Sequence, residues 1–143
     1  MAEIILSNRM QALTDMVTPG TVITDVGCDH GFVSVYLVQK GISPRVIAMD
    51  VRSGPLEHAR EHIREYGLED WIETRLSDGL HSLKTGEAAG MICAGMGGPL
   101  MEKILTEGRE QAKGFRELIL QPQSEIPHFR TYLMEEGYLL MDS

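Results

Sequence analysis

A glycine-containing turn at residues 25–31, which reads Asp-Val-Gly-Cys-Asp-His-Gly, constrains the fold more than any other stretch of this chain. It joins a β-branched run at 21–24 to an apolar run at 32–40 that ends before Gly41. That order predicts a strand, a tight turn and a buried helix. Gly27 and Gly31 let the backbone approach a ligand closely, and the start of the helix presents unpaired N–H groups. The stretch therefore predicts an α/β fold that holds a nucleotide-like ligand at this turn.

The same turn does not match the dinucleotide-binding fingerprint. That fingerprint requires Gly-x-Gly-x-x-Gly, and Asp29 stands where the second glycine is needed. The carboxylate of Asp29 would repel a pyrophosphate bound at the helix start. A cofactor with a positive charge and no phosphate fits better, and S-adenosylmethionine is such a molecule. A glycine also occurs at strand-to-helix turns in α/β proteins of many functions, so this turn alone leaves both interpretations open.

Apolar runs and amphipathic segments alternate along the rest of the chain. The pattern predicts strands at 21–26, 45–50, 71–76, 90–94, 115–121 and 138–141, and helices at 4–17, 32–40, 53–66, 99–107 and 125–136. Strands that alternate with helices at this spacing form right-handed βαβ units. With 143 residues, the chain is long enough for one domain and too short for two ordinary ones. The expected architecture is a doubly wound, mostly parallel sheet with helices on both faces.

Successive predicted strand ends carry either a carboxylate or a glycine turn. Asp50 ends the second strand, Asp78 follows the third, and 95–98 read Gly-Met-Gly-Gly after the fourth. In a doubly wound sheet the ligand lies outside the carboxyl ends of the strands, so these residues are expected to meet at one site. Asp50 is placed to accept hydrogen bonds from both ribose hydroxyls, and Asp78 from the adenine amine. Capping of the helix that follows each strand is the alternative role of both acids.

The composition narrows the classes of partner. A formal charge of −8 disfavours binding of nucleic acid through bulk electrostatics, because phosphate neutralisation needs clustered Lys and Arg. A local basic patch is the alternative, built from four arginines of one stretch: Arg45, Arg52, Arg60 and Arg64. Cys28 and Cys93 lack the spacing of a metal site or a disulfide framework, and indicate reduced thiols in a cytoplasm. No run is long and apolar enough to cross a membrane, so no membrane partner is expected.

Several stretches together resemble a known family. They are 6–9 (Leu-Ser-Asn-Arg), 25–31, the Asp50 strand end, 77–80 (Ser-Asp-Gly-Leu), 94–98 (Ala-Gly-Met-Gly-Gly) and 120–123 (Leu-Gln-Pro-Gln). The sequence resembles the class I S-adenosylmethionine-dependent methyltransferases and, more narrowly, the bacterial tRNA adenine-22 N1-methyltransferases. The Asp-His pair in the glycine turn and the Gly-Met-Gly-Gly turn are the specific features of this resemblance.

The resemblance implies S-adenosylmethionine as cofactor, S-adenosylhomocysteine as product, tRNA as partner and a Rossmann-like sheet. The residues expected to bind the cofactor are Asp25, Gly27, Cys28, His30, Gly31, Asp50, Val51, Asp78, Gly79, Gly95 and Met96. The residues expected to contact the substrate are Arg9, Gly97 and Gly98. No metal ligand is expected.

Asp29 is the candidate catalytic residue. It occupies a loop position that many methyltransferases give to glycine, beside the expected reactive end of the cofactor. The N1 nitrogen of adenine has a free lone pair at neutral pH, so a carboxylate would act by accepting a hydrogen bond from the exocyclic amine and stabilising the cationic product. The alternative is that Asp29 bonds loop backbone or the cofactor's ammonium group. His58 and His62 have the i, i+4 spacing of metal ligands, but without a third ligand a solvated helix face is favoured.

The chain departs from the family near its C-terminal end. Family members usually complete the sheet with a seventh strand and add a helical, coiled-coil-like domain implicated in tRNA binding, whereas this sequence ends at Ser143. We therefore expect a truncated methyltransferase domain over 1–143, with an unpaired sheet edge that invites association with another copy. The alternatives are a small-molecule methyltransferase, a cofactor-binding fragment without activity, and a nicotinamide-dependent dehydrogenase, which the broken fingerprint disfavours.

Overall fold

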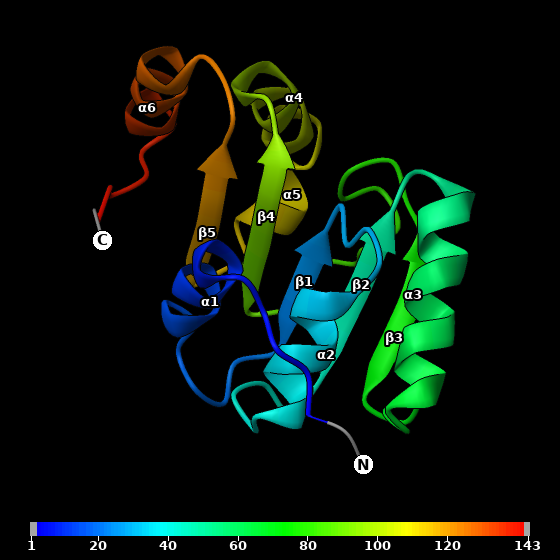
Figure 1. The fold of residues 1–143 in the computed structure, drawn as a ribbon. Coiled ribbons are helices and arrows are strands. Elements are labelled where there is room, and N and C mark those ends of the chain that lie inside the picture. Colours follow the sequence, from blue (N-terminus) through cyan, green and yellow to red (C-terminus); the bar gives the residue numbers. More distant parts are fainter. Residues whose placement is uncertain (1–2, 142–143) are drawn as a thin grey trace.

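A five-stranded parallel sheet forms the centre of the computed structural model, which describes residues 3–141 (Figure 1). The strands are β1 (Ile23–Val26), β2 (Val46–Asp50), β3 (Ile72–Leu76), β4 (Gly90–Met96) and β5 (Glu117–Pro122). Their order in the sheet is β3-β2-β1-β4-β5, and each neighbouring pair is parallel. The winding reverses beside β1, which makes its carboxyl end the topological switch point. The predicted doubly wound sheet is confirmed.

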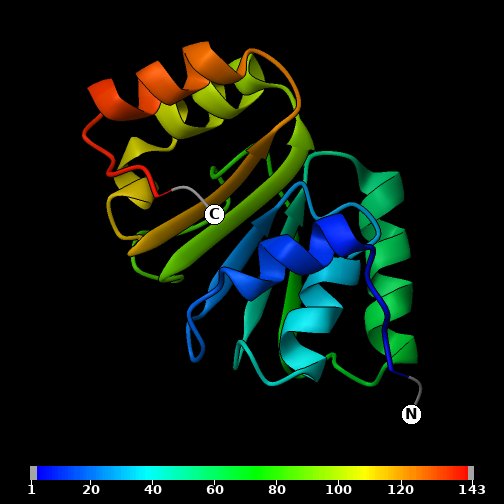
Figure 2. The ribbon, with the colours of Figure 1, turned by 60° about the vertical axis from the view of Figure 1, so that its left-hand side comes forward.

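Helices cover both faces of this sheet (Figures 1 and 2). They are α1 (Asn8–Asp15), α2 (Phe32–Gln39), α3 (Ser53–Glu65), α4 (Gly98–Glu107), α5 (Arg109–Ala112) and α6 (Ile126–Glu135). The first three helices share one hydrophobic cluster with the sheet, and the last three share a second one on the opposite face. The layer order predicts a ligand site at the strand ends, between the two layers.

The central strand β2 shows why its sequence is apolar throughout. Val46 and Ala48 belong to the cluster beneath α2 and α3, while Ile47 and Met49 belong to the cluster beneath α4. All four side chains are at most 2% exposed. Successive side chains of a strand point to opposite faces, so a strand buried on both faces needs apolar residues at every position.

Several element boundaries differ from the predicted ones. The first helix begins at Asn8 rather than at residue 4, because the Ser7 hydroxyl accepts a hydrogen bond from the Met10 N–H at 3.3 Å and caps the helix there. The fourth strand continues past residue 94 to Met96 through an irregularity at Gly95, whose φ of 80° suits a bulge. The short helix α5 had no counterpart in the sequence prediction.

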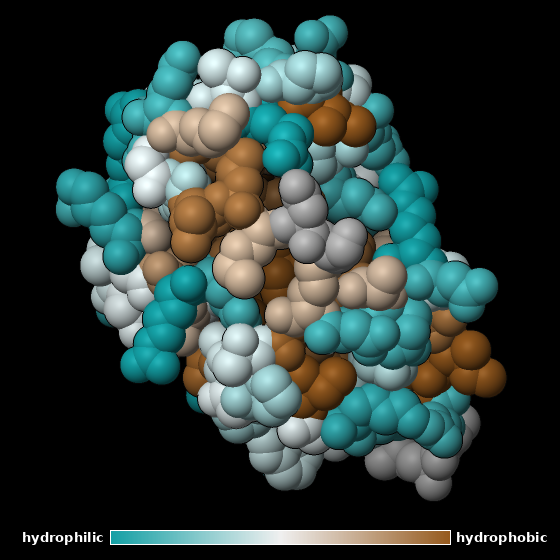
Figure 3. Space-filling model, turned by 90° about the vertical axis from the view of Figure 1, so that its left-hand side faces the viewer, coloured by the Kyte–Doolittle hydropathy of each residue, from teal (hydrophilic) through white to brown (hydrophobic). Residues whose placement is uncertain are grey.

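The predicted sixth strand at 138–141 is wrong. These residues form no strand in the described part of the chain, and Leu139 and Met141 are 87% and 85% exposed. An apolar run forms a strand only where its backbone pairs with a neighbouring strand, and residues 138–141 do not pair with the open edge of β5. Here the run lies beside an apolar groove of 470 Å³ that β5 and α6 also line, and Figure 3 shows hydrophobic surface on this side of the molecule.

No helix within residues 3–141 combines the length and the apolar character that crossing a membrane requires.

Gly98 offers a test of the packing at the start of α4. A Cβ at Gly98 would lie 2.6 Å from the Ser124 carbonyl oxygen, whereas a Cβ at Gly54, in the first turn of α3, would meet nothing within 4 Å. We expect Gly98→Ala to lower the free energy of unfolding by about 1–3 kcal/mol, because backbone must shift. The matched control, Gly54→Ala, should raise it by about 0.5 kcal/mol. Urea unfolding measures both, and equal stabilities would contradict this packing.

Candidate functional site

A cavity of 460 Å³ lies at the carboxyl ends of β1, β2 and β4. Small-molecule sites typically measure about 300–1,000 Å³. The β1–α2 turn, the strand ends, α1 and α4 all contribute to its wall. Of the residues predicted to form the site, those that line the cavity are Asp25, Gly27, Cys28, Asp29, Asp50, Val51, Asp78, Gly79, Gly95 and Met96. The structure therefore brings most of the predicted cofactor site together.

The remaining predicted residues lie outside the cavity wall. Gly31 faces α3, where an added Cβ would lie 3.0 Å from the Ala59 Cβ. The lack of a side chain at Gly31 therefore permits close packing of the turn on α3. Gly97 and Gly98 face residue 124 in the same way, and Arg9 is exposed on α1. His30 also lies outside the wall. Contacts of these residues with cofactor or substrate stay predictions.

Sequence reasoning missed the apolar part of the wall. It comes from Met10 and Leu13 of α1 and from Leu100 and Ile104 of α4, together with Val33, Ile92 and Ala94. The i, i+3 and i, i+4 spacings of the helical pairs place each pair on one helix face, which was the available signal. The spacing does not say which face turns toward the cavity. Arg52 and Ser77, beside two predicted acids, were missed as well.

Hydrogen bonds fix the β1–α2 turn to the end of β2. The N–H groups of Gly27 and Cys28 both donate to the Met49 carbonyl oxygen, at 2.8 Å each. Asp29 has a φ of 53° and its N–H donates to Asp50 Oδ2 at 3.0 Å. Asp is one of the few residue types other than glycine that adopts this left-handed conformation readily. The bond to Asp50 offsets part of the remaining conformational cost.

His30, the next residue of the turn, accepts a hydrogen bond from α3. The ring nitrogen Nδ1 of His62 lies 2.8 Å from the His30 carbonyl oxygen and donates to it. His62 also stacks on Phe32, with ring centroids 4.6 Å apart, and His58 stacks on His30. The predicted solvated face for the two α3 histidines is therefore wrong for His62, which is half-buried.

Asp50 supports the turn and is itself almost enclosed. Its side chain is 2% exposed, and its Oδ1 accepts the Arg52 N–H at 2.9 Å. Each carboxylate oxygen thus accepts one backbone hydrogen bond, and Oδ1 also accepts the Arg52 Nε–H at 3.4 Å. Oδ2 therefore has the more open second acceptor position. The loop-supporting role is observed, and the bonds to ribose hydroxyls stay a prediction.

Negative charge dominates the floor of the cavity. Burial raises the pKa of Asp25 to about 6, although the Ser34 hydroxyl donates to its Oδ2 at 2.7 Å and opposes the shift, and the nearby carboxylates of Asp50 and Asp29 raise the pKa further. Burial, together with the same carboxylates, also raises the pKa of the Cys28 thiol, which therefore stays protonated. A cationic ligand would relieve this repulsion, and a pyrophosphate would increase it.

The residues of the wall fit a positively charged cofactor without phosphate. A Cβ at Gly27 would lie 2.9 Å from the Met96 methyl carbon, so the glycine lets the turn lie close to Met96 on the opposite part of the wall. Asp78 is exposed at the wall, and no group in the described residues hydrogen-bonds its carboxylate, so both oxygens are free to accept from a ligand. Asp25, Asp50 and Asp78 then present three acceptors along one cavity.

Comparison with known proteins agrees with this geometry. Residues 6–143 match the protein family described as a methyltransferase domain. The chain belongs to this family. The methyltransferase domain is 37% identical over 142 residues to the Bacillus subtilis tRNA (adenine(22)-N(1))-methyltransferase. The aligned region covers 99% of this chain and 60% of that relative.

Solved structures show the same fold for this methyltransferase domain. The B. subtilis m1A22 tRNA methyltransferase TrmK superposes with a TM-score of 0.92 at 36% identity, over 98% of this chain and 60% of that one. Streptococcus pneumoniae Sp1610 in complex with S-adenosyl-L-methionine gives a TM-score of 0.93 at 32% identity, over 96% of this chain and 65% of that one. The fold is the Rossmann-like fold of class I methyltransferases. This chain spans less than two thirds of the length of these relatives.

The raised pKa of Asp25 predicts a pH-dependent stability. The pKa rises from 3.8 to about 6 in the folded state, so ionisation of Asp25 destabilises the fold. The penalty is absent below the lower pKa, grows between the two values and is complete above the higher one. Asp25→Asn should therefore raise the free energy of unfolding above the folded pKa by up to about 3 kcal/mol. Urea unfolding across this pH window measures the gain, and a gain that does not change with pH would contradict the burial of a charged carboxylate.

Proposed function

We propose that the protein is an S-adenosylmethionine-dependent methyltransferase that methylates the N1 nitrogen of an adenine in tRNA. The observation that carries the proposal is the acidic, glycine-walled cavity at the switch point of a methyltransferase domain. The name of the B. subtilis relative supports the substrate, and the S. pneumoniae complex supports the cofactor. The choice of target nucleotide rests on the relative alone.

The wall residues suggest how the cofactor would lie. Asp50 would accept from the ribose hydroxyls, while Asp78 would accept from the adenine amine and the Gly79 N–H would meet a ring nitrogen. Asp25 and Asp29 would then face the cationic end of the cofactor, where two carboxylates offset its charge. When bound, S-adenosylmethionine supplies an electrophilic methyl group.

Asp29 is the proposed acceptor for the target base. Its side chain is 60% exposed at the cavity, and Arg52 and His30 approach its Oδ1 only to 3.7 and 3.8 Å. Neither is a close ion pair, so the carboxylate keeps acceptor positions for an incoming amine. Because the adenine N1 lone pair is already available, Asp29 would hold the exocyclic amine and stabilise the positive charge that forms on the base. Positioning of the cofactor and the target base would supply most of the remaining rate enhancement.

Binding of a whole tRNA would require more than this domain. The relatives are longer, and the apolar groove along β5 lies on an edge that no strand covers within residues 3–141. We propose that chain outside 1–143 contributes to tRNA binding. Self-association through the β5 edge also stays a prediction. A cytoplasmic location is proposed from the tRNA substrate and from the free thiols of Cys28 and Cys93.

Calorimetric titration with S-adenosylmethionine, followed by methylation of unmodified tRNA mapped by nucleotide, tests this function on the full-length protein and on 1–143. We expect cofactor binding by both and N1-methyladenine in tRNA with the full-length protein. Methylation of small metabolites instead of tRNA would overturn the substrate, and binding of a nicotinamide cofactor instead would overturn the enzyme class.

Two substitutions separate chemistry from cofactor binding. Asp29→Ala should lower kcat by about 100-fold, because the acceptor for the base is lost, while the Kd for S-adenosylmethionine changes little. Asp50→Ala should weaken cofactor binding by about 10-fold or more, because charge-assisted hydrogen bonds are lost. Single-turnover kinetics and calorimetry measure the two effects. Parallel loss of activity and cofactor binding in Asp29→Ala would assign Asp29 to the loop or to the cofactor's ammonium group.

A further inference from the structure

Four ring side chains form a stacked cluster beside the cavity, and we call it the ring cluster: His30 and Phe32 at the start of α2, and His58 and His62 on α3. His30 and His58 stack with centroids 5.0 Å apart and planes 16° from parallel. Phe32 and His62 stack at 4.6 Å and 26°. His30 and Phe32 link the two pairs at 6.2 Å and 26°. His30 and His62, with centroids 6.1 Å apart, are tilted by 50°, so the rings stack in pairs without sharing one orientation.

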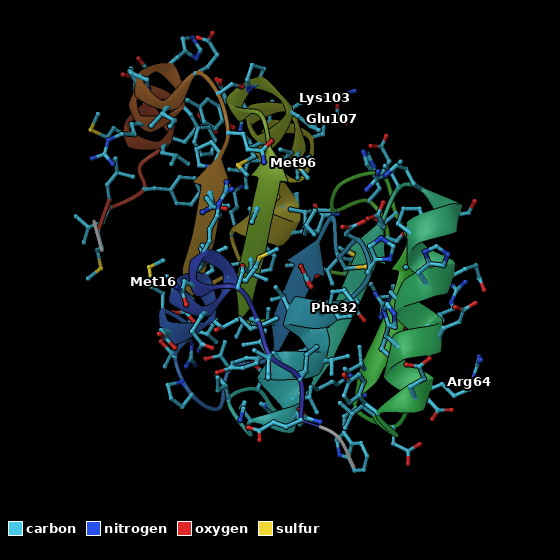
Figure 4. All side chains as sticks on the ribbon, in the orientation of Figure 1. Met16, Phe32, Arg64, Met96, Lys103 and Glu107 are labelled. Carbon is cyan, nitrogen blue, oxygen red and sulfur yellow. The ribbon has the colours of Figure 1, made fainter. Side chains whose placement is uncertain are left out.

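The ring cluster is partly open to solvent. Phe32 is 43% exposed, the His30 side chain is 41% exposed, and His58 is exposed on α3. In Figure 4, Phe32 lies at the start of α2 on the side toward α3. Aromatic residues make up only 6% of the chain, so an exposed phenylalanine among three imidazoles concentrates ring surface at one place. His30, Phe32 and His58 are not part of the buried core, so their exposed ring surface is available to a partner.

The ring cluster is continuous with the cavity wall. His30 Nε2 lies 3.8 Å from Asp29 Oδ1, and Asp29 lines the cavity. Asp29 Oδ1 also lies 3.7 Å from an Arg52 nitrogen, and the Arg52 side chain is 64% exposed. A base that reaches Asp29 would therefore bring the adjoining nucleotide over the ring cluster, with a guanidinium nearby for its phosphate.

The ring nitrogens favour recognition through ring faces over metal binding. His30 Nδ1 and His58 Nδ1 lie 3.2 Å apart and hydrogen-bond each other, and His62 Nδ1 donates to the His30 carbonyl oxygen. The nitrogens that face inward are thus engaged within the cluster. The part of the cluster that stays exposed belongs to His30, Phe32 and His58, and nucleobases of any sequence stack on such ring surface.

We propose that the ring cluster stacks a nucleobase adjoining the target base in the RNA substrate. The inference rests on the proposed function and extends it from the reacting base to its neighbour. The stacked base would hold the target base in the cavity, and the Arg52 guanidinium would contact the intervening phosphate.

Equilibrium binding to labelled RNA tests the inference on the full-length protein. The variant combines His58→Ala with Phe32→Leu, which keeps an apolar side chain on α2 and a good helix former on α3. The control is His128→Ala, at an exposed histidine of α6 that contacts Glu102. The probes are unmodified tRNA, a single-stranded adenosine oligonucleotide and an abasic oligonucleotide of the same length.

We expect the cluster variant to bind tRNA and the adenosine oligonucleotide about tenfold more weakly, since one stacking contact is lost. Its KM for tRNA should rise, while its Kd for S-adenosylmethionine, its affinity for the abasic probe and its thermal stability should match those of the control. The wild type should prefer the adenosine probe to the abasic one, and the variant should lose that preference.

Unchanged RNA affinity in a folded variant would overturn the inference, as would an equal loss for both oligonucleotides or a wild type that binds no RNA. The ring cluster would then serve only to pack α2 on α3. A wild type that shows the base preference but methylates no adenine in tRNA would overturn the proposed function and leave the stacking surface supported.

Discussion

The set of backbone hydrogen bonds between the β1–α2 turn and the end of β2 is the interaction on which the rest of the site depends. Met49 accepts two N–H groups through one carbonyl, and Asp50 accepts the N–H of Asp29. These bonds join neighbouring parallel strands just beyond the point where the regular ladder ends. They hold the glycine turn above the sheet and fix one wall of the cavity.

This arrangement places carboxylates close together, and their repulsion lowers the free energy of unfolding. Asp25 is buried within range of Asp29 and Asp50, and burial with repulsion raises its pKa to about 6. A protein selected for stability alone would place neutral groups there. The penalty has a functional interpretation, because a cationic ligand would offset the repulsion, and perturbed carboxylates concentrate at sites of binding and catalysis. The same charges make the turn unsuitable for a pyrophosphate.

Local patterns predicted much of this fold correctly. The continuous apolar run of β2, the Gly27 turn and the acid at Asp50 follow from rules that involve only a few neighbouring residues. Two predictions failed where the outcome depended on distant chain. Residues 138–141 have the composition of a strand but do not pair with the open edge of β5. His62 was predicted on a solvated helix face but lies against the turn that carries Asp29. Periodicity shows which residues lie on the same face of a helix or strand, but it does not show which part of the chain packs against that face.

The sequence by itself determined the fold class, the position of the ligand turn and the acids at the strand ends, because strand periodicity, glycine conformation and parallel winding are local or topological rules. Only the tertiary structure decided which of these residues meet. It turned the Asp29 N–H onto Asp50, placed Leu100 and Ile104 in the cavity wall, and stacked His58 on His30. The physical reason is that hydrogen bonds, charge repulsion and ring contacts act over a few ångströms, and the packing of helices on the sheet sets those distances.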